Sequence, residues 1–399
     1  MSVTYPLGFR AAGVTAGFKP SGLPDLGLLV GDPGTTAAAL FTTNVVAAAP
    51  IEVGRDRLAR GRIRAVLVNS GQANAATGPR GIDDVLATSA DAASLLGAEP
   101  DEVLPSSTGV IGEPLHVDRM REAMPGLVGA LSTAGGDAFA HAIMTTDTVH
   151  KQATAEAGAF RVGGCAKGVG MIAPNLATML AFVTTDAAVD AEDLQALACE
   201  QLAPRFNALT VDGCTSTNDT VVLLASGAAG GGDVVGSGSS AWEDLAHAID
   251  AVGASLVGQL VADGEGATHV MIIDVEGAAT DDDARRVAKA VADSPLVKTA
   301  VFGGDPNPGR FLQAAGGAGV TLDPGLLDVS IRGVPVAVGG VVPPAYFEPA
   351  SRLADEAGAA MKETEIAVHV RVGDGSGSSR AYGCDLSYEY VRINGEYTT

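Results

Sequence analysis

The sequence predicts a layered α/β fold with substantial sheet. Two observations support this prediction. Short apolar runs bounded by turn residues are typical of strands, and longer segments keep their apolar residues at helical spacing. The two kinds of segment alternate along the 399 residues, as expected where helices pack on sheets. A chain of this length can bury a large core, in two or three globular units or in one large two-lobed unit.

The expected strands are short and apolar, and two of them, 64–71 and 220–227, end in the turn residues Ser-Gly. They cover residues 64–71, 178–187, 220–227, 268–275, 327–338 and 365–372. In this assignment Thr178 is the first residue of its strand. Residues 227–240 are rich in Gly and Ser and are expected to form an exposed, flexible connection. No internal repeat is visible.

Two helices are expected in the middle of the chain. Asp190 is a plausible N-cap for apolar residues at helical spacing, and Pro204 is expected to end that helix. Ser240 and Glu243 fit a capping box. Behind them lies the expected inward stripe, formed by Trp242, Leu245, Ile249, Val252, Leu256 and Leu260.

The composition excludes several classes of function. The formal charge of −22 argues against nucleic acid as a partner, because phosphate binding needs a surplus of Lys and Arg. The four cysteines lie far apart without a C-x-x-C pair, so we expect reduced thiols rather than a disulfide or zinc framework. No secretory signal and no apolar run of membrane-spanning length is visible. We therefore expect a soluble cytoplasmic protein.

One stretch, K-G-V-G-M-I-A-P-N-L-A-T-M-L (167–180), suggests chemistry at Thr178. A threonine hydroxyl is a poor nucleophile unless a base lies beside it. The six histidines form no recognisable nucleophile–base motif, and His141 and His150 lack company that would indicate a metal site. Cutting the chain before Thr178 would supply the base, because a free α-amine titrates near pH 7.7–8.0. From the residues alone, a β-branched residue at the start of a strand is the simpler interpretation.

The same stretch closely resembles the signature around the self-processing threonine of the ornithine acetyltransferase family, also called the glutamate N-acetyltransferase or ArgJ family. Further blocks resemble that family in the same order and span nearly the whole chain. They are N-S-G-Q-A-N-A-A-T-G (69–78), P-S-S-T-G-V-I-G (105–112), A-I-M-T-T-D-T (142–148), T-S-T-N-D-T (215–220), D-G-E-G-A-T (263–268), D-S-P-L-V-K-T-A (293–300) and N-G-E-Y-T-T (394–399).

The resemblance implies an α/β sandwich of the N-terminal-nucleophile type that cuts itself between Ala177 and Thr178. The products would be an α chain (1–177) and a β chain (178–399) that form one intertwined folded unit, with two copies of each in a heterotetramer. The implied reaction transfers the acetyl group of N2-acetyl-L-ornithine to L-glutamate by a ping-pong mechanism through an ester on Thr178. It implies no metal and no cofactor, and it leaves open whether acetyl-CoA is an alternative acetyl donor.

The resemblance also assigns residues to roles. Thr108 and Gly109 match the family's oxyanion hole, which stabilises the tetrahedral intermediates. The substrate contacts match Thr146, Lys167, Thr178, Glu265, Asn394 and Thr399. Within that set we expect Lys167 to bind a carboxylate and Glu265 to bind the side-chain ammonium of ornithine.

Five positions depart from the family's pattern, and none is at the nucleophile or in the oxyanion block. They are Ala76 in place of Cys, Gly213–Cys214 in place of a more polar pair, His269 in place of Lys, and Pro308 in place of Trp. Two other functions stay open at this point. One is an amidohydrolase or aminopeptidase of the same fold that uses the same threonine, and the other is an uncut binding or scaffold protein.

Overall fold

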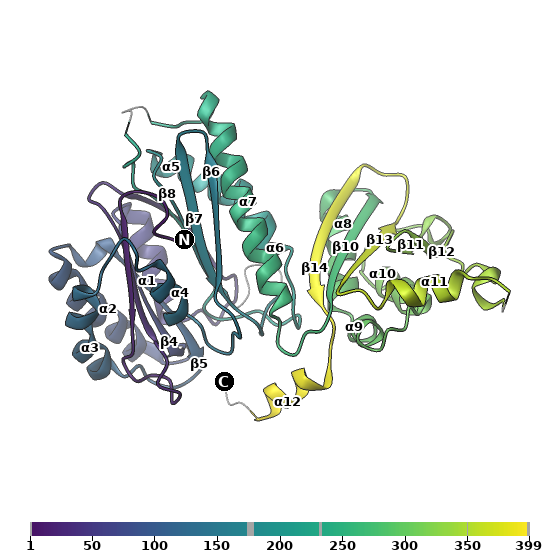
Figure 1. Cartoon of the computed structure of the whole chain (residues 1–399), viewed down its shortest axis with the longest axis horizontal. Helices are drawn as coiled ribbons and strands as arrows, with labels where there is room; N and C mark the ends of the chain where they lie inside the picture. The colour runs from purple at the N-terminus through teal and green to yellow at the C-terminus, as the bar shows by residue number, and fades with distance from the viewer. Residues whose placement is uncertain (1, 174–178, 231–233, 349, 397–399) are drawn as a thin grey trace. The chain divides into compact units, whose positions relative to one another are not determined.

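The structure, a computed structural model, describes residues 2–173, 179–230, 234–348 and 350–396. The chain forms two compact units (Figure 1). The first is built mainly from residues 1–207 and 214–260, and the second from residues 208–213 and 261–397. Each unit has its own sheets and its own apolar core.

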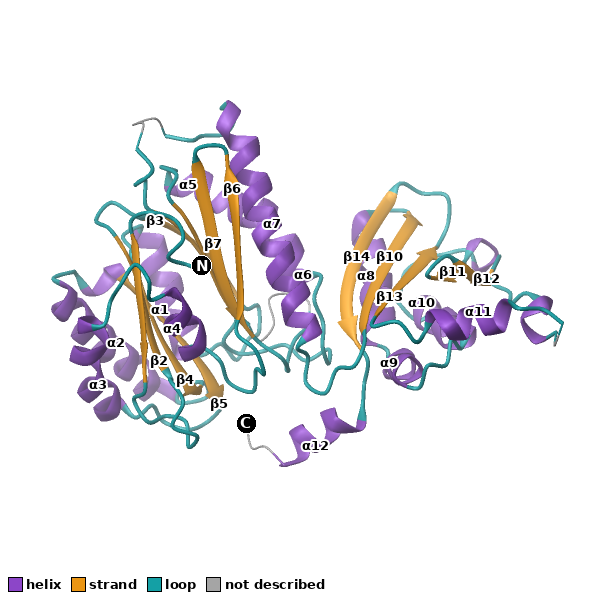
Figure 2. Cartoon of the chain, in the orientation of Figure 1, coloured by secondary structure: helices purple, strands orange, loops and turns teal. Residues whose placement is uncertain are grey.

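The first unit contains two sheets (Figure 2). The four-stranded sheet has the order β1 (Phe9–Val14), β2 (Leu26–Gly31), β4 (Ala65–Gln72) and β5 (Val103–Val110). The five-stranded sheet has the order β3 (Thr36–Phe41), β9 (Thr220–Ala225), β8 (Leu180–Thr185), β7 (Phe160–Lys167) and β6 (Lys151–Ala157). Neighbouring strands are antiparallel, except that β4 pairs with β5 and β8 pairs with β9 in parallel.

The two sheets share one buried apolar cluster, so they face each other as a sandwich. Leu29 and Val66 come from the first sheet, and Phe182 and Leu224 come from the second. Successive strand residues point to opposite faces. Accordingly, Leu28 and Leu67, the sequence neighbours of Leu29 and Val66, belong to a separate cluster with α2 (Gly78–Leu96) and α3 (Val117–Gly129).

Helices also cover the second sheet. A Cβ on Gly164 in β7 would lie 2.9 Å from Val252 Cγ1 and 3.2 Å from Leu256 Cδ1, so α7 (Ser240–Ala262) lies directly against β7. The neighbouring Cys165 belongs to the core between the sheets. This arrangement of two facing sheets flanked by helices confirms the predicted layered α/β sandwich. The unit's other helices are α1 (Ala49–Arg60), α4 (Gly136–Ala142), α5 (Ala191–Leu197) and α6 (Ala203–Asn207), with a 3-10 turn at Pro100–Glu102.

The prediction that Pro204 ends a helix is wrong. A helix does begin after Asp190, but α5 passes through a π-helical turn (Ala198–Leu202) into α6, which contains Pro204 and ends at Asn207. Proline lacks an N–H group and crowds the preceding turn. A π-helical turn changes the hydrogen-bond pattern just before the proline, so the helical path continues.

The predicted apolar stripe of α7 is confirmed. Five of its six residues have at most 1% exposure, namely Leu245, Ile249, Val252, Leu256 and Leu260. The sixth, Trp242, is partly exposed. By length and composition α7 is the one described helix that could cross a membrane, and 56% of its most apolar 18 residues are buried inside the protein. A core helix passes the same test.

The second unit has one five-stranded sheet, of order β12 (Val334–Ala337), β11 (Asp328–Ile331), β13 (Glu365–Arg371), β10 (Val270–Ala278) and β14 (Gly377–Cys384). Its helices are α8 (Asp281–Asp293), α9 (Pro295–Phe302), α10 (Pro308–Gly316), α11 (Leu353–Ala360) and α12 (Tyr388–Glu396), with 3-10 turns at Pro324–Leu326 and Pro344–Phe347. The single strand expected over 327–338 is a hairpin, because Arg332 and Gly333 both adopt positive φ and reverse the chain.

The other expected strands correspond to β4, β8, β9, β10 and β13. β8 begins at Leu180, and Thr178 lies outside the described residues. The described parts of 227–240 form turns and coil up to Ser240, where α7 begins. All four cysteines are free thiols, with Cys165 and Cys384 buried and Cys199 and Cys214 exposed.

Candidate active site

The two predicted oxyanion residues lie at the carboxyl end of β5. Thr108 is buried, and Gly109 stands opposite Gly71 of β4 in the parallel register. Residues 105–110 of the block are therefore part of a strand. Because β4 and β5 are parallel, their carboxyl ends lie at the same end of the sheet. Side chains from the blocks 69–78 and 105–112 therefore meet there.

Gly109 is required by its backbone. Its φ is +132°, and a Cβ there would lie 2.2 Å from the carbonyl carbon of Gly71. No side chain fits at that distance, because the contact is with backbone. A bulky residue at this position would push β4 and β5 apart, so variants of Gly109 test strand packing as well as the oxyanion role.

Lys167 ends β7 and is 2% exposed, although an isolated lysine is usually a solvated surface charge. Its Nζ donates a hydrogen bond to Thr108 Oγ1 at 3.1 Å. The structure thus brings together two residues that are 59 positions apart in the chain and that the family resemblance had placed in one site. The bond therefore links the end of β7 in one sheet of the sandwich to β5 in the other.

Asp147 is a buried carboxylate that sequence reasoning missed. Its Oδ1 accepts hydrogen bonds from Lys151 Nζ at 2.7 Å and from the Gly168 amide at 2.8 Å, and its Oδ2 accepts one from the Thr145 amide at 3.0 Å. Burial by itself raises the pKa of Asp147, but the ammonium groups of Lys167 and Lys151 outweigh burial and lower the pKa below its ordinary value.

These bonds also place Thr146. The segment Thr145–Asp147 is held against Gly168, the residue after Lys167. Because Thr146 lies within this segment, it is close to Lys167 at the end of the sandwich where Thr108 also lies. Thr146 is partly exposed. That Thr146 and Lys167 form one substrate site stays a prediction.

Asp219 is a second buried carboxyl group missed from sequence, and folding shifts its pKa in the opposite direction to that of Asp147. Its Oδ1 accepts a hydrogen bond from the Met179 amide at 2.9 Å, on the peptide bond that follows Thr178. Among the described residues its buried Oδ2 has no hydrogen-bond partner. Burial raises the pKa of Asp219 well above its ordinary value, although the Met179 amide and the nearby side chains of Thr42 and Ser216 partly oppose this.

Asn218, next to Asp219, joins strands of both sheets. Its Nδ2 donates to the carbonyl oxygens of Ala73 at 2.6 Å and Ser107 at 2.9 Å. The Ser107 hydroxyl in turn donates to Asn69 Oδ1 at 2.6 Å. The side chains of Asn218, Ser107 and Asn69, which form this series of hydrogen bonds, are all buried. The T-S-T-N-D-T block therefore fixes the edge where Thr108 and Lys167 meet.

Lys19 is a further cation at this edge that was not predicted. The Asp25 carboxylate accepts hydrogen bonds from the amides of Phe18 (2.6 Å) and Lys19 (3.0 Å), which fixes the turn that carries the side chain. Lys19 Nζ donates to the Pro24 carbonyl at 2.6 Å. Burial, with a smaller contribution from the positive charge of Lys167, lowers the pKa of Lys19 to about 8, although the negative charge of Asp25 opposes this.

Glu265 and Asn394 meet in the second unit. Asn394, on α12, donates from Nδ2 to Glu265 Oε2 at 2.8 Å. The two residues are 129 positions apart in the sequence, and this hydrogen bond shows that they lie together. The family resemblance assigns both to the substrate site. The remaining predicted residues, Ala177, Thr178 and Thr399, lie outside the described residues.

The charged residues that were missed had a signal in the sequence. Each is a charged side chain inside a short block of small or polar residues, as in G-F-K, T-T-D and T-N-D-T. The sequence alone could not say which of them are buried, because burial depends on strands that are distant along the chain.

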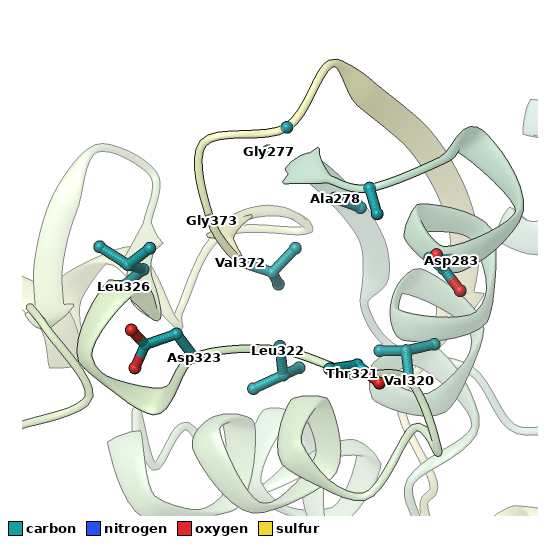
Figure 3. A pocket seen from close by; sticks show the side chains of 12 residues that line it. Gly277, Ala278, Asp283, Val320, Thr321, Leu322, Asp323, Leu326, Val372 and Gly373 are labelled. Carbon is teal, nitrogen blue, oxygen red and sulfur yellow. The ribbon is translucent and has the colours of Figure 1, made fainter.

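A pocket of about 230 Å³ in the second unit lies elsewhere (Figure 3). Val320, Leu322, Leu326 and Val372 give it a mainly apolar lining, with Asp283 and Asp323 at its margin. None of the predicted site residues lines it. In the described part of the chain, one group of His, Cys, Asp or Glu residues is close enough to hold a metal ion: Asp137, His141 and His150.

Comparisons with known proteins place the chain in a family. The sequence model of the ArgJ family matches residues 10–399. Arginine biosynthesis bifunctional protein ArgJ of Thermosynechococcus vestitus is 46% identical, covering 100% of this chain and 98% of that protein. The protein of the same name from Thermus thermophilus is 46% identical, with 100% of both covered.

A solved structure agrees with these sequence matches. The crystal structure of arginine biosynthesis bifunctional protein ArgJ from Bacillus halodurans is 38% identical with a TM-score of 0.50. The match covers 54% of this chain and 98% of that chain. With the family matched over nearly the whole sequence and the fold matched over half of it, the chain belongs to the ArgJ family.

Proposed function

We propose that the protein is a glutamate N-acetyltransferase that moves the acetyl group of N2-acetyl-L-ornithine to L-glutamate through an ester on Thr178. Membership of the ArgJ family supports the reaction. The observation that carries the proposal is the buried hydrogen bond from Lys167 to Thr108. It places a positive charge and a hydroxyl group, both able to stabilise an oxyanion, beside the segment that leads to Thr178.

In the proposed first half-reaction, Thr178 Oγ attacks the acetyl carbonyl carbon and its proton passes to the α-amine of Thr178. The C–N bond then breaks, and the departing ornithine amine takes that proton. In the second half-reaction the glutamate amine attacks the ester carbonyl and Thr178 Oγ leaves with a proton. One amide is exchanged for another, so the reaction is close to balanced in free energy.

Both tetrahedral intermediates carry an oxyanion, and Thr108 is arranged to stabilise it. Because Thr108 Oγ1 accepts a hydrogen bond from Lys167, its own O–H is directed to donate elsewhere. A positive charge behind the hydroxyl strengthens that donation. Loss of one such donor typically reduces kcat by about 10²–10³-fold.

The same edge favours a substrate carboxylate. Lys167 and Lys151 share the carboxylate of Asp147, burial raises the pKa of Asp219 and so disfavours a second negative charge, and Lys19 adds a further amine. An ammonium group has three N–H bonds, so the bond from Lys167 to Thr108 is compatible with a second bond to substrate. Glu265, held by Asn394, is suited to the side-chain ammonium of ornithine.

The topology supports self-cleavage without separation of the products. The proposed cut between Ala177 and Thr178 falls between β7 and β8, which pair with each other, while β8 also pairs with β9. The α chain (1–177) and the β chain (178–399) would therefore share one sheet. The Bacillus halodurans chain is about half as long as this one, as expected of a cut product.

Supplying N2-acetylornithine with and without glutamate tests the reaction. Acetylglutamate is expected only when glutamate is present, and intact mass analysis should find one acetyl group on the peptide that begins at Thr178. Release of acetate without transfer would instead favour the alternative function, an amidohydrolase or aminopeptidase of the same fold. An uncut, unlabelled chain on denaturing electrophoresis would favour an inert binding protein.

Three finer proposals accompany this function. The relatives are named bifunctional, so acetyl-CoA is proposed as an alternative donor, tested by acetylglutamate formation from acetyl-CoA and glutamate. No metal or other cofactor is proposed for the transfer, which should persist after EDTA treatment. A cytoplasmic heterotetramer of two α and two β chains is proposed, tested by cell fractionation and by light scattering on purified protein.

A further inference from the structure

The loop that carries Thr146 is bracketed by three metal-binding side chains. Asp137 and His141 lie one turn apart on α4, and His150 immediately precedes β6. Residues one helical turn apart share a face of the helix. The loop 143–149 therefore leaves from one histidine and returns at the other.

The three side chains converge. Asp137 Oδ2 lies 3.5 Å from His141 Nδ1, and Asp137 Oδ1 lies 3.4 Å from His150 Nε2. The two imidazole ring centroids are 4.3 Å apart. One ligand atom from each residue lies within 4.8 Å of the other two. With bonds of about 2.0–2.2 Å from metal to nitrogen or oxygen, a single ion can reach all three after small side-chain movements.

We propose that Asp137, His141 and His150 form a Zn²⁺ site. The sequence showed no further metal ligand beside the two histidines. The structure supplies Asp137 as that ligand, from α4, the helix that also carries His141. Each side chain is between 41% and 65% exposed, so solvent can provide the fourth ligand of a tetrahedral ion.

The ligand chemistry selects the type of ion. Two imidazoles with one carboxylate suit Zn²⁺ and its neighbours among the transition metals, whereas Mg²⁺ and Ca²⁺ prefer oxygen ligands alone. Gln152 Nε2 donates a hydrogen bond to Asp137 Oδ1 at 2.9 Å. Contacts of this kind orient a ligating carboxylate.

The site is distinct from the proposed catalytic residues, but it is connected to them. Metal binding would join the two ends of the loop that holds Thr146 and Asp147. Asp147 in turn fixes that loop against Gly168. The effect on substrate binding rests on the proposed function, whereas the metal site itself does not.

Calorimetric titration of the full protein with ZnCl₂ tests the site independently of activity. The protein is first treated with EDTA and exchanged into a non-coordinating buffer at pH 7.5. Cys199 and Cys214 are replaced by Ser in every sample, because their exposed thiols could also bind zinc. One equivalent is expected to bind, and MgCl₂ at the same concentrations is expected to give no saturable heat.

Variants locate the ion. His150→Gln and Asp137→Asn should each weaken Zn²⁺ binding at least about tenfold, since even loss of an outer contact commonly weakens a metal site 10–100-fold. His247→Gln, at an exposed histidine on α7, is the matched control and should leave the affinity unchanged. Circular dichroism checks that each variant is folded. Absence of saturable binding in the parent protein, or equal affinity in His150→Gln and His247→Gln, overturns the proposal.

Discussion

Asp147→Asn is expected to destabilise the first unit strongly. Asn keeps one oxygen for Lys151 and Gly168 but presents an amide N–H₂ to the Thr145 N–H, so two donors face each other and the bond that Oδ2 accepts is lost. The ammonium groups of Lys151 and Lys167 also lose their shared buried counter-charge. Breaking a buried ion pair on one side typically costs about 3–5 kcal/mol.

Asp219→Asn is the matched control, because it changes a buried carboxyl group whose pKa is raised rather than lowered by folding. The Asn side chain can still accept the Met179 N–H through its oxygen, and its N–H₂ replaces a carboxyl oxygen that has no hydrogen-bond partner among the described residues. One hydrogen bond is worth about 1 kcal/mol, so Asp219→Asn should lose no more than about that amount, and it should gain on the parent where the unfolded aspartate is ionised.

The single tryptophan, Trp242, makes the measurement specific to the first unit. Urea unfolding followed by its fluorescence reports that unit rather than the second. If m is about 3 kcal/mol/M, Asp147→Asn lowers the urea midpoint by about 1–2 M and Asp219→Asn by about 0.3 M or less. A larger loss in Asp219→Asn than in Asp147→Asn would refute the assignment of charge states.

The two carboxyl groups also predict opposite responses to pH. The pKa of Asp147 is lowered by folding, so its contribution is complete above the unfolded value of about 3.9 and is lost as pH falls through the lower folded pKa. The gap between parent and Asp147→Asn should be constant from about pH 5 to 8. The pKa of Asp219 is raised, so its contribution is present below about pH 3.9 and is lost as pH rises through the folded pKa. Asp219→Asn should therefore gain on the parent as pH rises.

Three further predictions concern the proposed reaction. Thr178→Ala should abolish both the cut and acetyl transfer, whereas Thr178→Ser should retain part of each; an uncut Thr178→Ser on denaturing gels would contradict a simple hydroxyl mechanism. Lys167→Met should lower kcat by about 10²-fold through loss of the charge behind Thr108, and Lys151→Met, which spares that bond, should retain a higher kcat in the same steady-state assay. Gly109→Ala should lower the urea midpoint as well as turnover, because its Cβ meets the Gly71 backbone; an unchanged midpoint would contradict that contact.

The sequence by itself determined the strands and helices whose pattern is local. The apolar runs that became β4, β9, β10 and β13 were recognisable, and so was the inward stripe of α7, because periodicity reflects which face each residue presents. The family blocks identified the family, and the structure then paired residues from different blocks, Thr108 with Lys167 and Glu265 with Asn394. Local rules failed at Pro204 and at the turn of Arg332, where hydrogen bonding and positive φ decide the path.

Only the tertiary structure decided the charge states and the clusters. Asp147 and Asp219 are the same residue type in similar polar blocks, yet folding lowers the pKa of one and raises that of the other. The difference comes from which ammonium groups the sandwich brings beside each buried carboxyl. Likewise, Asp137 joins His150 only because the loop between α4 and β6 returns to the helix. Burial and the proximity of charges depend on segments far apart in the chain, and no local pattern encodes them.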